Sequence, residues 1–414
     1  MDLTRRNILA GLATLTATAG ITGGSTSLKA QQSLGGPAFA RGALMPGLAP
    51  GYLNNASHHP VTSGTAAAIA GYANKLVTGQ AEGKSQAVRS KFARLINANA
   101  EEVVYAPSTS MGENLVAMAL DLPRKGGRIV TDALHFVGSF YLYEQLAKQG
   151  MEVVILPVLE DGSVSNAQYA EAITPDTRLV AVSHVSWVNG FQHNLKALSD
   201  LAHAQGAYLF ADIIQSAGNT PIDVKAMGVD FACSGTYKWL MGDFGLAFLY
   251  ADSRLVEALT PPWYGYLQTR NFVTPLTHLY PFDEPGSPAY TSTPAGGVGG
   301  IFNGSFPPRM IEAGAEVSLD WLLETGVETL QAHRQPMIQA LQSTFRERGF
   351  RPYTPEGSSS SLVSFIMKDA AALDEKLKLA GITIATYPDR FRISPSFFND
   401  MNDIDRVIDV IGRA

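Results

Sequence analysis

Asp230-Phe-Ala-Cys-Ser-Gly-Thr-Tyr-Lys238-Trp-Leu240 is the stretch that decides the fold expected for this chain. Its first half is mostly apolar, which is typical of a strand buried inside a sheet, and the lysine follows that strand. Upstream, the apolar run Tyr208-Leu-Phe-Ala-Asp212 ends in a carboxylate. Ligands of an open α/β sheet bind at the carboxyl ends of its strands. We therefore expect Asp212 and Lys238 to face the same site.

Short apolar segments alternate with amphipathic ones on both sides of this stretch. Continuous apolar runs indicate strands that are buried on both faces, and the segments between them have helical periodicity. The predicted strands are Val103–Ala106, Arg128–Thr131, Glu152–Val158, Arg178–Val182, Ala207–Ala211, Val229–Cys233 and Leu246–Tyr250. The predicted helices are Asn114–Leu120, Phe140–Gln149, Ala167–Ile173 and Leu195–Gln205. This order favours an α/β fold with a mainly parallel sheet and helices on both faces.

The pattern changes after the last of these strands. Residues 261–308 are rich in proline, glycine and aromatic residues, and a helical stretch then runs from Met310 to about Arg348 with a break near Gly326. The remaining predicted elements belong to a smaller α+β domain: Ser361–Met367, Ala371–Ala380, Ile382–Thr386, Phe391–Ile393 and Asn402–Ile411. We therefore divide the chain into an export signal (1–30), a segment that joins the small domain at the entrance of the site (31–60), a large domain (61–308) and a small domain (309–414).

The composition indicates a folded protein and excludes several functions. Of 414 residues, 46% are hydrophobic, and 31 lysine and arginine residues stand against 37 aspartate and glutamate residues. The net charge of −6 offers no attraction for nucleic acid, so we expect no nucleic-acid partner. The single cysteine excludes an internal disulfide framework and a cysteine-rich zinc site, and no arrangement of histidine and carboxylate residues indicates a metal.

The N-terminus has the features of an export signal. Thr4-Arg5-Arg6-Asn7 precedes a mildly apolar stretch from Ile8 to Ile21, an order that resembles signals of the twin-arginine type. Cleavage is expected after Ala30, although Leu28 fits poorly at the third position back. The stretch is too short and too rich in glycine and threonine for an anchor, so we expect no stable membrane insertion. Twin-arginine machinery exports folded proteins, which predicts a periplasmic protein; the alternative is a disordered tail that happens to contain an arginine pair.

A lysine and an aspartate at neighbouring strand ends suit the cofactor pyridoxal 5′-phosphate. The amine of Lys238 is placed to form the Schiff base with this cofactor, and Asp212 is placed to pair with its protonated ring nitrogen. Taken singly, such a lysine is usually solvated and such an aspartate usually caps a turn. The prediction therefore rests on the two residues occurring together.

The motifs around these two residues resemble the class V aminotransferase family, which includes cysteine desulfurases, kynureninases and isopenicillin N epimerase-like proteins. The resemblance rests on the stretch up to Leu240 with Asp212-x-x-Gln215 upstream, and it covers the chain from Tyr52 to the C-terminus. It implies the fold of pyridoxal-phosphate-dependent transferases (fold type I, like aspartate aminotransferase), with a large, mainly parallel α/β domain and a smaller C-terminal α+β domain. It also implies Lys238 and Asp212 as catalytic residues and a homodimer with shared active sites.

Other motifs extend the resemblance to the surroundings of the cofactor. Pro107-Ser-Thr-Ser-Met111 precedes a helix and resembles the family's phosphate-binding turn, although an ordinary helix cap would use the same residues. Phe302-Asn-Gly-Ser305 resembles the turn that reaches the phosphate of the neighbouring subunit. Phe136 matches the ring that stacks on pyridoxal, and beside it His135 is predicted to be a satisfied or exposed loop histidine. The implied cofactor-binding residues are Thr109, Ser110, Met111, Phe136, Asp212, Gln215 (at the ring hydroxyl), Thr236, Tyr237 (at the phosphate), Lys238 and Ser305.

Two further motifs concern the substrate. Arg390-Phe-Arg392-Ile-Ser-Pro395 resembles the family's carboxylate-binding motif, in which Arg392 is the matching residue. A guanidinium group binds a carboxylate through two hydrogen bonds and so orients an amino acid. Asn54-Asn55-Ala-Ser-His58-His59 matches a segment that lines the substrate pocket in relatives, so Asn55 and His58 are candidate substrate contacts. The two histidines could equally be ordinary loop residues.

Departures from the family bear on the reaction. Cysteine desulfurases use a nucleophilic cysteine on a mobile loop, whereas Cys233 lies in an apolar strand and the connection from Thr386 to Arg392 is too short for such a loop. Trp187 also replaces an asparagine near the ring hydroxyl. We expect an aminotransferase-like enzyme acting on the amino group of an amino acid or of a peptide-borne amino acid, akin to exported members of the family that modify peptide siderophores such as pyoverdine. The alternatives are a lyase, by C–S cleavage or β-elimination, or an epimerase on the same site; a non-catalytic pyridoxal-phosphate-binding protein would require a lost lysine or arginine.

Overall fold

The computed structural model describes residues 39, 41–81, 87–273, 291–304 and 306–413. The predicted export signal and Ser305 lie outside these residues. From Phe39 onward the described chain forms one compact unit. None of its helices has the length and hydrophobicity that a membrane-spanning segment needs.

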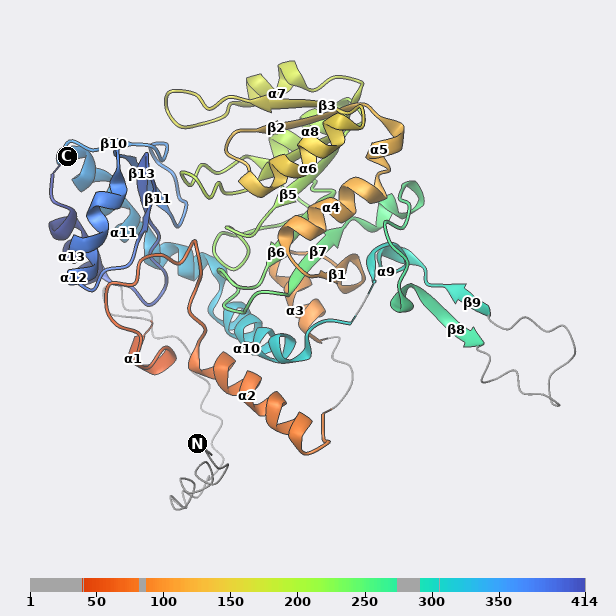
Figure 1. Ribbon diagram of the computed structural model, residues 1–414, viewed down its shortest axis with the longest axis horizontal. Helices are drawn as coiled ribbons and strands as arrows, with labels where there is room; N and C mark the ends of the chain where they lie inside the picture. Colours follow the sequence, from red (N-terminus) through yellow and green to blue (C-terminus); the bar gives the residue numbers. More distant parts are fainter. Residues whose placement is uncertain (1–38, 40, 82–86, 274–290, 305, 414) are drawn as a thin grey trace, which may run out of the picture. The chain divides into compact units, whose positions relative to one another are not determined.

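The largest sheet among the described residues has seven strands in the order β1-β7-β6-β5-β4-β2-β3 (Figure 1). Every pairing in it is parallel except the two made by β7. The strands are β1 (Val103–Ala106), β2 (Arg128–Asp132), β3 (Glu152–Leu156), β4 (Thr177–Ser183), β5 (Tyr208–Asp212), β6 (Phe231–Gly235) and β7 (Ala247–Ala251). Each strand lies within about two residues of its predicted bounds. The mainly parallel α/β sheet is therefore confirmed.

Helices cover both faces of this sheet, which explains why its strands are apolar at nearly every position. Along β4, Leu179 and Ala181 pack on one side, while Val180 and Val182 pack on the other. The first side is covered by α4 (Thr109–Ala119) and α6 (Val137–Lys148). The second is covered by α3 (Ala87–Leu95), α7 (Asn166–Ala172), α8 (Leu195–Ala204) and α10 (Arg309–Thr325).

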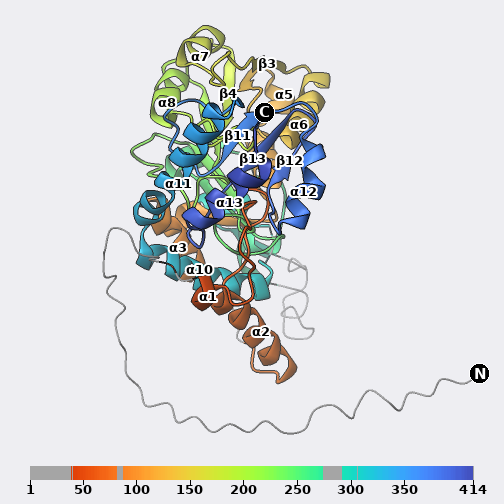
Figure 2. The same ribbon diagram turned by 90° about the vertical axis from the view of Figure 1, so that its left-hand side faces the viewer.

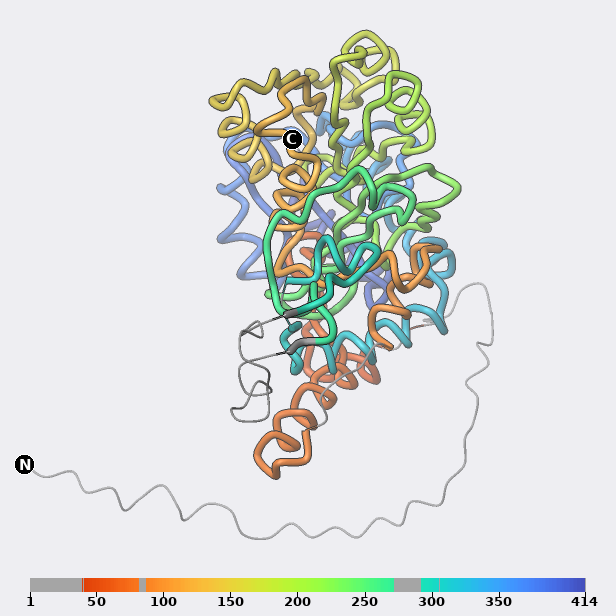
Figure 3. Tube along the Cα trace, turned by 90° about the vertical axis from the view of Figure 1, so that its right-hand side faces the viewer, coloured from red at the N-terminus to blue at the C-terminus, as the bar shows by residue number. Residues whose placement is uncertain are grey.

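Irregular chain follows β7, as the composition predicts. It contains two short 3₁₀ turns, α9 (Gly297–Phe302) and an antiparallel pair formed by β8 (Thr269–Val273) and β9 (Thr291–Pro294). This part of the chain, green to cyan in Figure 3, faces the viewer there. The remaining short helices are α1 (Arg41–Leu44) and α5 (Leu122–Lys125).

A second, antiparallel sheet has the order β10-β11-β13-β12 (Figure 2). Its strands are β10 (Arg351–Pro352), β11 (Val363–Ile366), β12 (Ala385–Thr386) and β13 (Arg390–Ile393), and it packs with α11 (Val327–Glu347), α12 (Asp374–Leu379) and α13 (Met401–Ile411). Phenylalanine rings fill the core, with Phe345 and Phe365 5.0 Å apart between centroids. Leu53 from the N-terminal segment is buried in the same core. The segment around Leu53 is thus part of the core and pairs with the small sheet's surroundings through the bridges Tyr52–Thr383 and Asn54–Ser394.

Several elements differ from the sequence analysis. Helix α3 is not predicted, and α4 begins at Thr109 although its predicted start is Asn114. Helix α2 (Ser63–Val77) is not predicted, because it is rich in alanine, mostly exposed and without an apolar stripe. The predicted helix Ala371–Ala380 begins instead with a 3₁₀ turn, Ala370–Leu373, which continues into α12.

Candidate active site

The carboxyl ends of β5 and β6 bring Asp212 and Lys238 to one site. Asp212 is the last residue of β5, and Lys238 lies shortly beyond Gly235, where β6 ends. Both side chains are buried, with 3% and 7% of their surface exposed. Each group changes the pKa of the other, because Asp212 raises the pKa of Lys238 and Lys238 lowers that of Asp212. The two predicted catalytic residues therefore share one buried site.

Lys238 presents a buried amine. Within the described part of the chain, Nζ makes no hydrogen bond and no ion pair, and it lies 5.7 Å from the centroid of the Tyr237 ring. Burial lowers the pKa of Lys238 to about 8, against the upward effect of Asp212 and with a further downward effect of Arg392. About a tenth of such amines are neutral at pH 7, compared with fewer than one in a thousand for an exposed lysine. A neutral amine is the form that attacks a carbonyl carbon.

Asp212 has one oxygen held by the backbone and one left for a ligand. Oδ1 accepts a hydrogen bond from the Ile214 amide at 2.9 Å, and Oδ2 has no hydrogen-bond donor among the described residues. Burial raises the pKa of Asp212, while His135, the Ile214 amide and Lys238 lower it. A cationic ring nitrogen at Oδ2 would supply the partner that a buried carboxylate needs.

The N-terminus of α4 offers a place for a phosphate group. Ser108 caps the helix by accepting a hydrogen bond from the Met111 amide at 3.1 Å, and Thr109 Oγ1 accepts one from the Gly235 amide at 2.9 Å. The amides of Thr109 and Ser110 lie before the first hydrogen bonds of the helix and are not used by this cap. Free amides and the helix dipole both favour a dianion here.

Two predicted cofactor contacts have side chains that are engaged within the protein. Gln215 donates from Nε2 to the Ala56 carbonyl and accepts at Oε1 from the Trp239 indole, both at 2.9 Å. Thr236 donates its hydroxyl to the Asp243 carbonyl at 2.6 Å. These bonds hold the loop around Lys238 in place, and they leave each side chain with only part of its hydrogen-bonding capacity for a ligand.

Phe136 lies in an aromatic group at the site. Its ring is partly buried and meets Trp187 edge-on, with 6.3 Å between centroids. Trp187 in turn donates its indole N–H to the His135 carbonyl at 3.3 Å and meets Tyr387 edge-on at 6.1 Å. The ring of Phe136 is therefore held against Trp187.

Arg392 presents a buried guanidinium group with no carboxylate partner among the described residues. Nη1 donates to the Trp187 carbonyl and Nη2 to Ser57 Oγ, both at 2.6 Å, while Nε is buried and unpaired. Burial lowers the pKa of Arg392, Tyr387 raises it and Arg390 lowers it. A buried cation without a counter-charge is unfavourable. A substrate carboxylate would remove that cost, which fits the predicted role of Arg392.

The structure separates the two adjacent histidines. His59 is buried, with Nε2 2.7 Å from Ser396 Oγ, and burial lowers its pKa to about 4. His58 is exposed, and its ring lies 5.4 Å from Phe244 and 6.4 Å from Tyr237. Tyr237 itself stacks on Phe244 at 4.0 Å. His59 is therefore a packed core residue, whereas His58 stands with two aromatic rings beside Lys238.

Two predicted contacts remain. Asn55 is buried and donates from Nδ2 to the Ser394 carbonyl at 2.8 Å, while its Oδ1 is buried without a hydrogen-bond partner. That oxygen is free to accept a hydrogen bond from a ligand. Ser305 lies outside the described residues, and its neighbour Gly304 lies against the ring of Trp263.

The sequence analysis missed a buried network behind Asp212. His135 is fully buried, with Nε2 3.1 Å from Glu113 Oε1 and Nδ1 3.0 Å from Ser183 Oγ. Glu113 also accepts hydrogen bonds from the hydroxyls of Ser139, at 2.5 Å, and Tyr143. In the sequence, Glu113 stands next to other polar residues at the start of α4 and gives no signal of this network.

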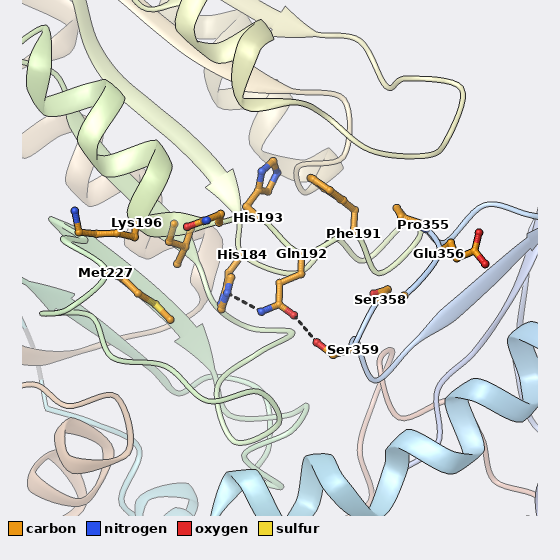
Figure 4. Close-up of a pocket in the computed structure, with 13 residues that line it drawn as sticks. His184, Phe191, Gln192, His193, Lys196, Met227, Pro355, Glu356, Ser358 and Ser359 are labelled. Carbon is orange, nitrogen blue, oxygen red and sulfur yellow. Dashed lines mark hydrogen bonds between the residues drawn. The ribbon is translucent and has the colours of Figure 1, made fainter.

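A pocket of about 530 Å³ lies between the β4–α8 connection and the loop 355–359 (Figure 4). Ser359 donates its hydroxyl to Gln192 Oε1, and the Gln192 amide nitrogen lies against His184 Nε2, each at 3.4 Å. None of the predicted site residues lines this pocket. It is therefore separate from the site formed by Asp212 and Lys238.

Comparison with known proteins agrees with this geometry. The aminotransferase class-V family profile matches residues 65–387. The uncharacterized aminotransferase YcbU of Bacillus subtilis is 28% identical over 333 residues, which cover 79% of this chain and 83% of that protein. A cysteine desulfurase of Pectobacterium atrosepticum is 28% identical over 352 residues, which cover 80% of this chain and 82% of that one.

Two solved structures share the fold. The cysteine desulfurase CsdA of Escherichia coli superposes with a TM-score of 0.77 at 22% identity, covering 92% of this chain and 98% of that one. A lysine-to-alanine mutant of C-DES, with glycine covalently linked to its pyridoxal phosphate, superposes with a TM-score of 0.78 at 19% identity and covers 89% and 98%.

The residues present fit pyridoxal phosphate. Among the described residues, nothing pairs with the buried amine of Lys238, with Oδ2 of Asp212 or with the first amides of α4. These groups match the carbonyl, the ring nitrogen and the phosphate of the cofactor. The chain belongs to the class V aminotransferase family of pyridoxal-phosphate-dependent enzymes.

Proposed function

We propose that this enzyme acts on the amino group of an amino acid, free or carried by a peptide, and that transamination is its reaction. The observation that carries the proposal is the buried guanidinium of Arg392, which has no carboxylate partner in the described chain. It lies close enough to Lys238 to lower the pKa of that lysine. A carboxylate bound at Arg392 would place the α-carbon of an amino acid next to the amine that exchanges its proton.

Each residue of the site has a distinct role in this reaction. Arg392 and Ser57 orient the carboxylate of the substrate, and Asn55 offers an acceptor for an N–H group. Lys238, with its pKa lowered to about 8, removes the proton from the α-carbon and, in a transamination, would deliver it to the carbonyl carbon of the cofactor and not back to the α-carbon. Asp212 balances positive charge at the ring nitrogen of the cofactor. Pyridoxal phosphate, when bound, supplies the electron sink for the pair left at the α-carbon.

A lyase is the second candidate, because several similar proteins are named for C–S chemistry. The desulfurases named above and C-DES, described as a cystine C-S lyase, share the fold. Cys233 is buried in β6, and burial raises the pKa of its thiol well above the ordinary value. Only residues 387–389 connect β12 to β13. A reaction through a cysteine persulfide is therefore disfavoured, and elimination without a protein thiol, or epimerisation, remains on the same site.

Product analysis distinguishes these reactions. The purified holoenzyme is incubated with a panel of L-amino acids and short peptides, each with pyruvate as amino acceptor. Transamination yields a keto acid from the donor and alanine from pyruvate, elimination yields ammonia, and epimerisation yields the D-isomer. Lys238→Ala is the matched control. Ammonia or sulfide released without alanine would replace the aminotransferase with the lyase.

We also propose that the protein is exported by the twin-arginine route to the periplasm and acts as a homodimer. Arg5-Arg6 before an apolar stretch supports the route. Exposed aromatic residues beside Gly304 support the dimer, because Tyr264 and Phe306 are 91% and 52% exposed. Sedimentation of the holoenzyme tests the dimer, and an active monomer at working concentration would contradict it.

A further inference from the structure

Glu113 and His135 form a buried ion pair that the steps above do not use. Glu113 lies in the first turns of α4 and His135 in the connection between β2 and α6, and their side chains are 2% and 0% exposed. Their atoms Oε1 and Nε2 are 3.1 Å apart. Ser139 and Tyr143, both on α6, donate their hydroxyls to the same carboxylate. Burying such a pair costs desolvation energy, so we expect a function that explains its position.

The pair is connected to the catalytic aspartate through the sheet. His135 Nδ1 lies 3.0 Å from Ser183 Oγ, and Ser183 is the register partner of Asp212 in the parallel pairing of β4 with β5. Partner residues of adjacent strands point to the same face, and the strands lie about 4.8 Å apart. The imidazole ring of His135 therefore contacts Ser183, which is the neighbour of Asp212 across the sheet.

The charges around His135 come from three elements. Glu113 on α4, Asp212 at the end of β5 and Asp132 at the end of β2 all raise the pKa of His135, against the opposing effect of burial. From α6, the Tyr143 ring stacks on the imidazole at 6.1 Å. Lys238 also lowers the pKa of Asp212. After burial, His135 has the largest effect on the pKa of Asp212, and it lowers that pKa.

We propose that His135, held by Glu113, is a positioning residue that acts through Asp212: its positive charge keeps Asp212 ionised and so keeps the proton on the ring nitrogen of the cofactor. This inference rests on the assignment of Asp212 as the partner of that nitrogen. The charges would then alternate in sign in the order Glu113, His135, Asp212 and the ring nitrogen. Without the imidazolium, a buried carboxylate favours its neutral form and would take the proton from the ring.

Nitrogen NMR of the holoenzyme tests the proposal directly. Apoenzyme is loaded with pyridoxal phosphate labelled with ¹⁵N at the ring, and the ring-nitrogen shift is followed from pH 6 to pH 10. In His135→Gln the shift should move toward that of an unprotonated ring, with a midpoint lower than in the parent by about one pH unit or more. An unchanged titration in a folded, loaded His135→Gln variant would overturn the proposal.

His184→Gln is the matched control. His184 is another buried histidine at a strand end, with Nδ1 3.0 Å from Ser216 Oγ. Burial lowers its pKa to about 3, so it is neutral and its replacement removes no charge. In His184→Gln, the titration of the cofactor's ring nitrogen should match that of the parent enzyme. If His184→Gln shifted this titration as much as His135→Gln does, the change would be due to altered packing and not to lost charge. That result would overturn the proposal.

Two further variants keep the test decisive. Glu113→Gln removes the anion that holds the proton on His135 and should shift the titration in the same direction, which covers the case in which His135→Gln fails to fold. Asp212→Asn should abolish ring protonation altogether. If Asp212→Asn leaves the nitrogen protonated, the assignment of Asp212 fails; if it removes the proton while His135→Gln and Glu113→Gln change nothing, only the role of His135 fails.

Discussion

Arg392 Nη2 donates a hydrogen bond to Ser57 Oγ at 2.6 Å, between residues that lie 335 positions apart in the chain. The same guanidinium donates from Nη1 to the Trp187 carbonyl, in the connection that follows β4. Three distant parts of the chain therefore converge on one cation. Its remaining N–H groups are free of protein carboxylates in the described chain, which makes it the natural anchor for a substrate carboxylate.

Replacing Arg392 should therefore weaken substrate binding. We expect Arg392→Gln to lower kcat/KM for the amino donor by about a hundredfold, chiefly through KM, because a charge-assisted pair is lost. Arg392→Lys should retain part of the activity, because an ammonium keeps the charge without the planar fork. Steady-state kinetics check both. Arg346→Gln, at an exposed pair with Glu356, is the control and should behave like the parent.

The amine of Lys238 should set the pH dependence of cofactor capture. Its pKa is lowered to about 8, so the neutral fraction of the amine rises about tenfold per pH unit below pH 8 and levels off above it. Stopped-flow absorbance of apoenzyme mixed with pyridoxal phosphate measures the rate. Borohydride reduction followed by peptide mapping should label Lys238 alone. A rate that still climbs tenfold between pH 9 and pH 10, or a label on another lysine, would contradict the assignment.

Cys233 should be inert in the folded enzyme. Its side chain is buried beneath α4, where Gly112 leaves room for the sulfur, and its pKa is raised well above the ordinary value. We expect no thiol reaction in native protein and one thiol per chain in denaturant. Cys233→Ala should keep activity within about twofold and lose about 1 kcal/mol of stability. Loss of turnover in a folded Cys233→Ala variant would restore the persulfide mechanism.

Export should depend on the arginine pair. Replacement of Arg5 and Arg6 by lysine should leave active, uncleaved, cofactor-loaded protein in the cytoplasm, because the twin-arginine route carries folded proteins. Cell fractionation with mass measurement of the N-terminus checks this outcome. Normal processing of the double variant in the periplasm would point to another pathway.

The strand ends could be predicted because charge marks them. Asp212 closes one apolar run and Lys238 follows another, and burial on both faces makes such runs stand out in the sequence. The sequence gives a weaker signal for residues whose role depends on tertiary contacts. Nothing local to Gln215 or Thr236 indicates that their polar groups are engaged by Ala56, Trp239 and Asp243.

Buried charges were the least predictable part of the site. The Glu113–His135 pair joins residues 22 positions apart on different elements, and each alone looks like an ordinary polar residue. Likewise Ser57 lies in a quoted motif, but its role depends on a partner in the last strand of the small sheet. Helix α2 escaped prediction for the opposite reason, because it buries too little for hydrophobic periodicity to appear.

The bridges from Tyr52 to Thr383 and from Asn54 to Ser394 have a consequence for the order of assembly during synthesis. The ribosome completes the strands of the large sheet, and with them Asp212 and Lys238, long before it reaches residue 383. The segment around Tyr52 and Asn54 must wait until residues 383 and 394 have emerged. A nascent chain can therefore gain Asp212 and Lys238 early, but it gains Arg392, the proposed anchor of the substrate carboxylate, only after about 150 more residues have been synthesised.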